Sequence, residues 1–121
     1  MHHASKDTVT PYPTPHREIV YELLGRNGGI TETSSLARVD IPPGVASRPH
    51  YHPVAEEIYY VLEGKGRVEI NGESRELVPG DAVLIKPGQH HQIWCVGEAT
   101  LAILCTCTPA WEPSNTVYLD E

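Results

Sequence analysis

Short apolar runs separated by Gly, Pro and Asn repeat along the chain from Arg17 onward. Runs of this kind, rich in β-branched and aromatic residues and closely punctuated by turn residues, are typical of an all-β sandwich or barrel. The segment IVYELLG fits either a short helix or a strand. Asn71-Gly72 lies between two runs and predicts a two-residue hairpin turn. We therefore predict an all-β fold with very little helix, whose main strands fall in SSLARVDI, EIYYVLE, GRVEIN, SRELV, DAVLI, HQIWCV and TLAILCTC.

The two ends of the chain depart from this pattern. Residues 1–16 are polar and carry Pro11, Pro13 and Pro15 at alternate positions, which predicts an extended arm rather than a packed element. The remaining residues, 17–121, are enough for one compact domain and too few for two. Near the end, TVYL is a candidate last strand that packs either outside the barrel or against a second subunit.

Charge and composition exclude several classes of partner. The net charge is −7, so no basic surface is available for phosphates or anionic lipid. We therefore expect no nucleic-acid partner and no membrane partner. No apolar run approaches the ~20 residues of a membrane span, and no segment at the start resembles a signal peptide. The expected location is the cytoplasm.

The three cysteines, Cys95, Cys105 and Cys107, lack the paired spacing of a disulfide framework and suit a reducing compartment. Cys105 and Cys107 are one residue apart and can share a strand face. Soft metal sites usually use C-x-x-C turns instead. We interpret all three cysteines as free, with Cys105 and Cys107 as buried thiols.

The stretch HYHPVAEE places two histidines and two adjacent glutamates close together. Because side chains i and i+2 of a strand point to the same face, His50 and His52 share a face. Pro53 removes a ladder donor and ends that strand, so the next strand begins at Glu56 or Glu57 beside the histidines. These glutamates face opposite ways, so only one of them joins the histidines. Alternation alone does not choose between them.

A second histidine pair follows a turn predicted at Pro87-Gly88. His90 and His91 are adjacent and therefore face opposite ways. Two imidazoles, one carboxylate and a third imidazole form a mixed nitrogen and oxygen set that suits Fe, Mn, Co, Ni, Cu or Zn. We therefore predict one divalent transition metal as the cofactor.

These clusters resemble the two sequence motifs of the cupin superfamily. The resemblance spans roughly residues 34–108, which is most of the chain. The first family motif reads G-x5-H-x-H-x3 or 4-E-x6-G. Every position of it is filled here, by Gly44, His50, His52, Glu57 and Gly64.

The second family motif reads G-x5-P-x-G-x2-H-x3-N. Gly80, Gly88 and His91 match it. Two positions depart, because Lys86 stands in place of Pro and Cys95 in place of Asn. We expect the motif glycines to sit at turns where a Cβ would resist a positive φ.

Membership of this superfamily implies a small antiparallel β-barrel of jelly-roll type, often dimeric, with one divalent metal in its mouth. We therefore expect a homodimer and a single barrel domain over 17–121. The metal ligands that the resemblance implies are His50, His52, Glu57 and His91, which selects Glu57 from the two glutamates.

Two segments, LARVDIPPG and HPVAEEI, also resemble plant germins, some of which are manganese oxalate oxidases. Germins carry an asparagine just before the PPHxH segment of the motif. Ser47 and Arg48 occupy that region here, which argues against oxalate chemistry.

Strand alternation suggests which residues line the cavity around the metal. Arg48 is in register with His50 and is a candidate anchor for an anionic substrate, or else a surface arginine. Tyr59 is a candidate proton donor, or else fills the barrel. Cys95 is a candidate redox-active thiol, or else a small buried residue. With Gln89 these residues form the substrate-binding set, and Tyr59 and Cys95 are the catalytic candidates.

Three hypotheses about function follow. We favour a small metalloenzyme that acts on a small oxygenated metabolite as a dioxygenase, which requires Fe or Mn and consumes oxygen. A non-oxidative enzyme, such as a sugar isomerase or epimerase, a lyase or a polyketide-type cyclase, works anaerobically and tolerates Zn, Ni or Co. A binding module holds a small ligand without turnover. The fold does not choose among them.

Overall fold

The structure is a computed structural model that describes residues 1–12 and 14–120. Pro13 of the predicted arm and Glu121 therefore lie outside the described residues. Two 3-10 helices, η1 (Asn27–Gly29) and η2 (Pro113–Asn115), are short, and strands make up most of the regular secondary structure of the described residues, as predicted. The strands are β1 (Ile19–Leu24), β2 (Ser35–Ile41), β3 (His50–Tyr51), β4 (Glu56–Glu63), β5 (Gly66–Ile70), β6 (Glu73–Leu77), β7 (Ala82–Ile85), β8 (His91–Cys95), β9 (Leu101–Thr108) and β10 (Val117–Tyr118).

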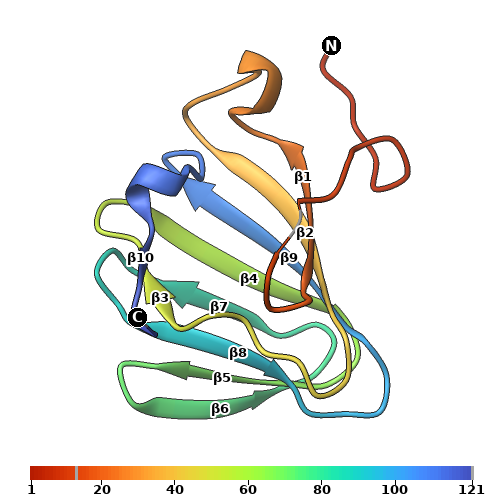
Figure 1. The fold of residues 1–121 in the computed structure, drawn as a ribbon, viewed down its shortest axis with the longest axis vertical. Coiled ribbons are helices and arrows are strands. Elements are labelled where there is room, and N and C mark those ends of the chain that lie inside the picture. The colour runs from red at the N-terminus through yellow and green to blue at the C-terminus, as the bar shows by residue number, and fades with distance from the viewer. Residues whose placement is uncertain (13, 121) are drawn as a thin grey trace.

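The strands form two antiparallel sheets that face each other. One sheet has the order β1-β2-β9-β4-β7, and the other has the order β10-β3-β8-β5-β6. Figure 1 shows the two layers, with β1, β2, β9 and β4 above β8, β5 and β6. The segment IVYELLG, ambiguous from its sequence, forms β1 and pairs with β2. This two-sheet arrangement is the jelly-roll architecture that the sequence predicts.

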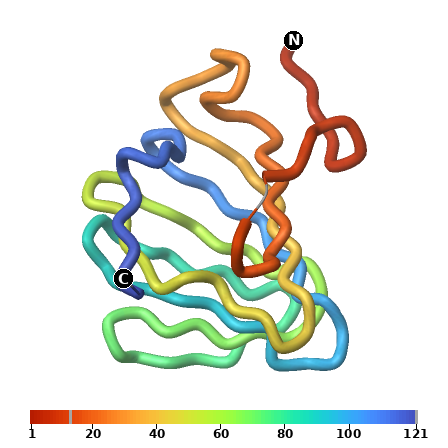
Figure 2. The backbone as a smooth tube through the Cα atoms, in the orientation of Figure 1, coloured from red at the N-terminus to blue at the C-terminus, as the bar shows by residue number. Residues whose placement is uncertain are grey.

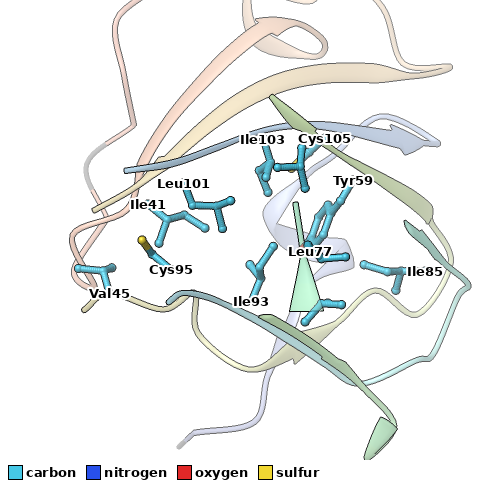
Figure 3. Packing of buried hydrophobic residues seen from close by; sticks show 12 residues of the cluster. Ile41, Val45, Tyr59, Leu77, Ile85, Ile93, Cys95, Leu101, Ile103 and Cys105 are labelled. Atoms are coloured by element: carbon cyan, nitrogen blue, oxygen red, sulfur yellow. The ribbon is translucent and has the colours of Figure 1, made fainter. Parts of the chain in front are cut away.

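Alternation along the strands places apolar side chains between the sheets. In β4, Glu57, Tyr59 and Val61 are buried, whereas Glu56 and Tyr60 are exposed. Such a period of two is expected where one face of a strand packs on a core and the other meets water. Figure 3 shows the buried side chains gathered between the two layers.

Tight turns between the strands need residues with positive φ. Asn71 and Gly72 have φ of 48° and 86°, which confirms the predicted hairpin turn between β5 and β6. The motif glycines also have positive φ, as predicted. Gly64 shows why: its φ is 81°, and an added Cβ would collide with the backbone oxygen of Thr100.

The C-terminal segment folds back onto the sheets, whereas the N-terminal arm begins away from them and then returns to β1, as Figure 2 shows. Tyr12 of the arm forms a bridge with Val20 of β1, and its ring packs edge-on against Trp111. At the other end, β10 pairs with β3, so the TVYL segment does form a last strand. None of the helices in the described part of the chain is long and apolar enough to span a membrane.

Candidate metal centre

The predicted ligands come from three strands that meet between the sheets. His50 lies in β3 and His52 directly follows it, while Glu57 lies in β4 and His91 begins β8. His50 and His91 are direct partners in the β3–β8 ladder. One ligand atom from each of the four residues lies within 4.8 Å of the others, so this group could hold a metal ion.

A backbone carbonyl fixes the orientation of each imidazole. The Nδ1 atoms of His50 and His91 lie 2.7 Å and 2.9 Å from the carbonyl oxygens of Arg48 and Gln89. The Nδ1 of His52 lies 2.9 Å from the carbonyl oxygen of Asn115, far away in the sequence. Because a carbonyl only accepts, each Nδ1 carries the hydrogen, and in a neutral ring Nε2 keeps its lone pair. This arrangement is typical of histidines that ligate a metal through Nε2.

Glu57 is the acidic member of the group and is only 6% exposed. Its Oε1 lies 3.1 Å from Nε2 of His91 and 3.4 Å from Nε2 of His52. Burial alone would raise the pKa of Glu57, but the two imidazoles outweigh burial and hold that pKa well below its usual range. The carboxylate is therefore ionised at neutral pH, as a ligand must be.

The imidazoles are affected differently by their surroundings. Burial, helped by the neighbouring His91, lowers the pKa of His50 to about 4, so this ring is neutral at pH 7. Burial also opposes the charged form of His52, but Glu57 outweighs it and raises that pKa. The Nε2 of His52 is buried, and its 3.4 Å contact with Oε1 of Glu57 lacks hydrogen-bond geometry, so it has no hydrogen-bond partner within the described residues. Such an orphaned atom is costly unless something binds it, so the site fits a metal ion.

The candidate ligands open onto a cavity of about 270 Å³ between the sheets. Most of its wall is apolar and comes from β1, β2, β8 and β9. The N-terminal arm and the segment that contains Trp111 and Tyr118 complete it. The apolar lining residues include Val20, Ala37, Val39, Ile41, Ile93 and Ile103.

Two of the predicted substrate-binding residues line this cavity. Tyr59 is buried, and its ring centroid lies 6.1 Å from that of His91. Arg48 also lines the cavity, but its Nη2 lies 2.8 Å from Oδ1 of Asp120, and its guanidinium stacks 3.7 Å from the Tyr118 ring centre. These contacts occupy the guanidinium that was predicted to anchor an anionic substrate.

The other two predicted residues lie elsewhere. The Gln89 side chain accepts a hydrogen bond from the backbone N–H of Lys86 in the turn before β8, outside the cavity wall. Cys95 is buried, and its thiol donates to the carbonyl oxygen of Ala99 at 3.2 Å. Figure 3 shows Cys95 beside Val45 at one end of the core, away from Tyr59.

Several polar groups in the wall were not among the predicted site residues, and three of them are buried beside the candidate ligands or on β1. Cys105 and Cys107 are buried free thiols, as interpreted from the sequence, and both line the cavity. The thiol of Cys107 donates to Oε2 of Glu57 at 3.4 Å. Glu22 of β1 is also buried and lines the cavity. The one-residue spacing of Cys105 and Cys107 could have indicated that both thiols face the cavity. Glu22 lies in the segment IVYELLG, whose sequence fits either a helix or a strand, so its face could not be predicted.

Comparisons with known proteins agree with this geometry. Residues 37–107 match the Cupin domain family. An uncharacterised protein of Methanocaldococcus jannaschii is 36% identical over 114 residues, or 94% of this chain and 91% of that protein. The oxalate-binding protein of Thermotoga maritima is 32% identical over 82 residues, or 68% of each. The tetracenomycin polyketide synthase protein TcmJ of Streptomyces glaucescens is 30% identical over 74 residues, 61% of this chain and 50% of that protein.

Solved structures share the same architecture. KdgF from Halomonas superposes with a TM-score of 0.79 at 20% identity, covering 93% of this chain and 96% of that one. A predicted oxalate decarboxylase from Thermotoga maritima has a TM-score of 0.77 at 26% identity, covering 88% of this chain and 97% of that one. Because the family match extends over 37–107 and contains all four candidate ligands, the chain belongs to the cupin family.

Proposed function

We propose that this protein is a divalent-metal enzyme that acts on a small oxygenated molecule, and that it is a dioxygenase. The observation that carries the proposal is the convergence of three anchored imidazoles and one ionised carboxylate on a mostly apolar cavity. An iron or manganese ion held by His50, His52, Glu57 and His91 would supply Lewis acidity and redox chemistry at this point.

The groups beside the candidate ligands support oxidation over proton transfer. Burial, followed by the charge of Glu57, raises the pKa values of Tyr59, Cys105 and Cys107. These groups stay protonated at neutral pH and are poor bases. Isomerisation and epimerisation need a protein base whose pKa lies near the working pH. Oxidation needs no such base from the wall, whose role is to position the substrate and exclude water.

The proposal is tested by elemental analysis of protein purified without metal-affinity resin or chelator, followed by oxygen-electrode assays with catechols, β-diketones and thiols. We expect about one iron or manganese per chain and oxygen uptake that depends on one of these substrates. Zinc or nickel without oxygen uptake would contradict the dioxygenase proposal. An absence of metal even after reconstitution would contradict the metalloenzyme proposal as a whole.

Similarity to polyketide synthase proteins supports a second candidate, a non-oxidative cyclase or lyase. Besides TcmJ, the polyketide synthase protein CurC of Streptomyces cyaneus is 31% identical over 67 residues. The chain spans about half the length of TcmJ and 44% of CurC. Turnover of a polyketide-like substrate under anaerobic conditions would favour this candidate. Stoichiometric binding without turnover would instead favour a binding module, as the name of the oxalate-binding relative suggests.

We also propose that the protein works as a homodimer in the cytoplasm. The outer face of β4 and β7 exposes Ile58, Tyr60 and Leu84 to 41%, 43% and 47%. Exposed apolar side chains that adjoin one another often mark a protein interface. Light scattering should give a dimeric mass that Ile58→Glu reduces, whereas Val54→Glu, outside this face, leaves it unchanged. A monomeric mass for the unaltered protein would contradict the dimer.

A further inference from the structure

The cavity has a second polar end that the metal proposal does not use. Glu18, Val20 and Glu22 of the β1 region share the face that lines the cavity, and Glu22 is only 8% exposed. The inner face of this strand therefore carries acidic groups, whereas Ile19 on its outer face is 37% exposed. This inverts the usual arrangement, in which a sheet buries apolar side chains and exposes charged ones.

The carboxyl group of Glu22 is only partly satisfied by the protein. Its Oε2 accepts a hydrogen bond from the backbone N–H of Asn27 at 3.2 Å. No residue of 1–12 or 14–120 forms an ion pair with Glu22, and its Oε1 has no hydrogen-bond donor among them. A carboxyl group in a cavity wall that no cation of the described chain pairs with can instead bind a cation or an N–H donor of a ligand.

The sheet register places Glu22 away from the metal group along one continuous wall. Glu22 pairs with Ala37 of β2, Ala37 with Cys105 of β9, and Cys105 with Tyr59 of β4. Three strand spacings of ~4.8 Å separate Glu22 from Tyr59, or about 14 Å along the sheet. Tyr59 is two residues from Glu57, so the backbones of Glu22 and the candidate ligands lie several strand spacings apart, and the Glu22 carboxyl group lies beside Gly25 and Ser35.

The charges around the cavity also indicate what it excludes. Glu18, Glu22 and Glu57 line it, and within the described residues Arg48 is its one lysine or arginine. Arg48 already pairs with Asp120. Away from the proposed metal position, a negatively charged group of a ligand would meet these carboxyl groups, whereas a positive group would be favoured.

The size of the cavity limits the ligand further. Its volume of about 270 Å³ is nearly twice that of the ~150 Å³ cavity that binds benzene in an engineered protein. This space suits one substituted ring or two fused rings. The wall between the two polar ends is lined by Val20, Ala37, Val39 and Ile103, which suit an apolar body.

We propose that Glu22 is a specificity-determining residue that binds a protonated amine, or another N–H donor, at the end of the ligand remote from the metal. The ligand class is then a small molecule with oxygen donors at one end, an apolar ring in the middle and a cationic group at the other end. The role given to the oxygen donors rests on the proposed function, whereas the role of Glu22 rests on the cavity alone.

The test uses three catechols that share a ring and differ in the opposite group: dopamine with an ammonium, 4-methylcatechol with no charge and 3,4-dihydroxyphenylacetate with a carboxylate. Their dissociation constants are measured by anaerobic calorimetry with zinc-loaded and metal-free protein. We expect dopamine to bind at least about tenfold more tightly than the carboxylate, within the range of a hydrogen bond to a charged group. Glu22→Gln should reduce this preference to about threefold or less without weakening 4-methylcatechol.

Glu18→Gln is the matched control, because Glu18 lies on the same face but is less buried. It should keep most of the preference for dopamine. An unchanged preference in Glu22→Gln, an equal loss in Glu18→Gln, or no dopamine binding at millimolar concentration in either form would overturn the inference. If the Glu22-dependent preference for dopamine persists but zinc does not tighten the binding of any of the three catechols, the metal proposal fails and the role of Glu22 stands.

Discussion

Glu57 and Glu22, two buried carboxyl groups in the cavity wall, differ in the partners that the protein gives them. At the metal end, Glu57 lies beside two imidazoles, and three Nδ1 atoms are each held by a carbonyl. At the other end, Glu22 receives one backbone hydrogen bond and no cation from the described chain. Groups that converge on one point can share a single metal ion. A single unpaired group instead suits one particular ligand.

The largest effect is expected from substituting two of the candidate metal ligands. In His50→Ala/His91→Ala, half of the candidate ligands are lost, so we expect metal affinity to fall more than about 100-fold, beyond the range of outer-shell changes. Metal content after reconstitution and dialysis measures this. His90→Ala is the control, because the exposed His90 ring stacks on Tyr51. Undiminished metal content in the double variant would refute the assignment of the ligands.

The pH dependence of stability probes the same end without metal. His50 has a pKa of about 4 in the folded state, against about 6.5 when unfolded. As the pH falls below 6.5, the unfolded chain gains a proton that the folded chain takes up only near pH 4, so the folded state loses stability in this window.

Between pH 7.5 and 4.5 the free energy of unfolding of the metal-free protein should therefore fall by roughly 2 kcal/mol more than that of His50→Gln. His52, whose raised pKa acts in the opposite direction, is present in both proteins and largely cancels. Denaturant unfolding at each pH gives the comparison, and parallel pH profiles would contradict it.

Cys107 offers a smaller test, because its thiol donates to Glu57 and lies between the two ends. Removing this donor in Cys107→Ala should lower metal affinity by about tenfold, as loss of an outer-shell hydrogen bond does. Cys107→Ser keeps a donor and should bind metal nearly as the unaltered protein does. Competition with a chromogenic chelator measures both affinities. Equal affinities in the two variants would show that the thiol only fills space.

The smallest effect should come from the pair at the edge of the cavity. Asp120→Asn removes a negative charge beside Arg48 at the cavity wall, so an anionic ligand is repelled less there. Because the pair is partly exposed, we expect only about threefold tighter binding of 3,4-dihydroxyphenylacetate. Calorimetry with this ligand is the measurement. Tighter binding of the uncharged 4-methylcatechol as well would mean that Asp120 acts by blocking access.

The sequence predicted what depends on local spacing. The H-x-H pair, the glycines of the turns and the alternation of β4 are properties of short segments, and the structure places Glu57 inside and Glu56 outside. Strand alternation identifies the sheet face on which a side chain lies, but not how far along the strand it lies from the site. Cys95 faces inward like His91, yet four residues at ~3.4 Å each carry it about 14 Å along β8 and away from the site.

Two other features depend on distant segments. Arg48 meets Asp120, 72 residues away, only because β10 returns to pair with β3. Glu22 lies in a segment whose period fits helix or strand, and a single buried carboxyl group has no motif. Gln89 precedes β8 in a turn, where strand alternation does not apply.

The hydrogen bond from His52 to the carbonyl of Asn115 has a consequence for how the protein is made. The imidazole and its anchor are 63 residues apart. A ribosome that has already exposed the H-x-H segment has not yet synthesised the residue that orients its second histidine. Metal capture by the nascent chain should therefore be weak until residue 115 has left the exit tunnel and folded back beside β3.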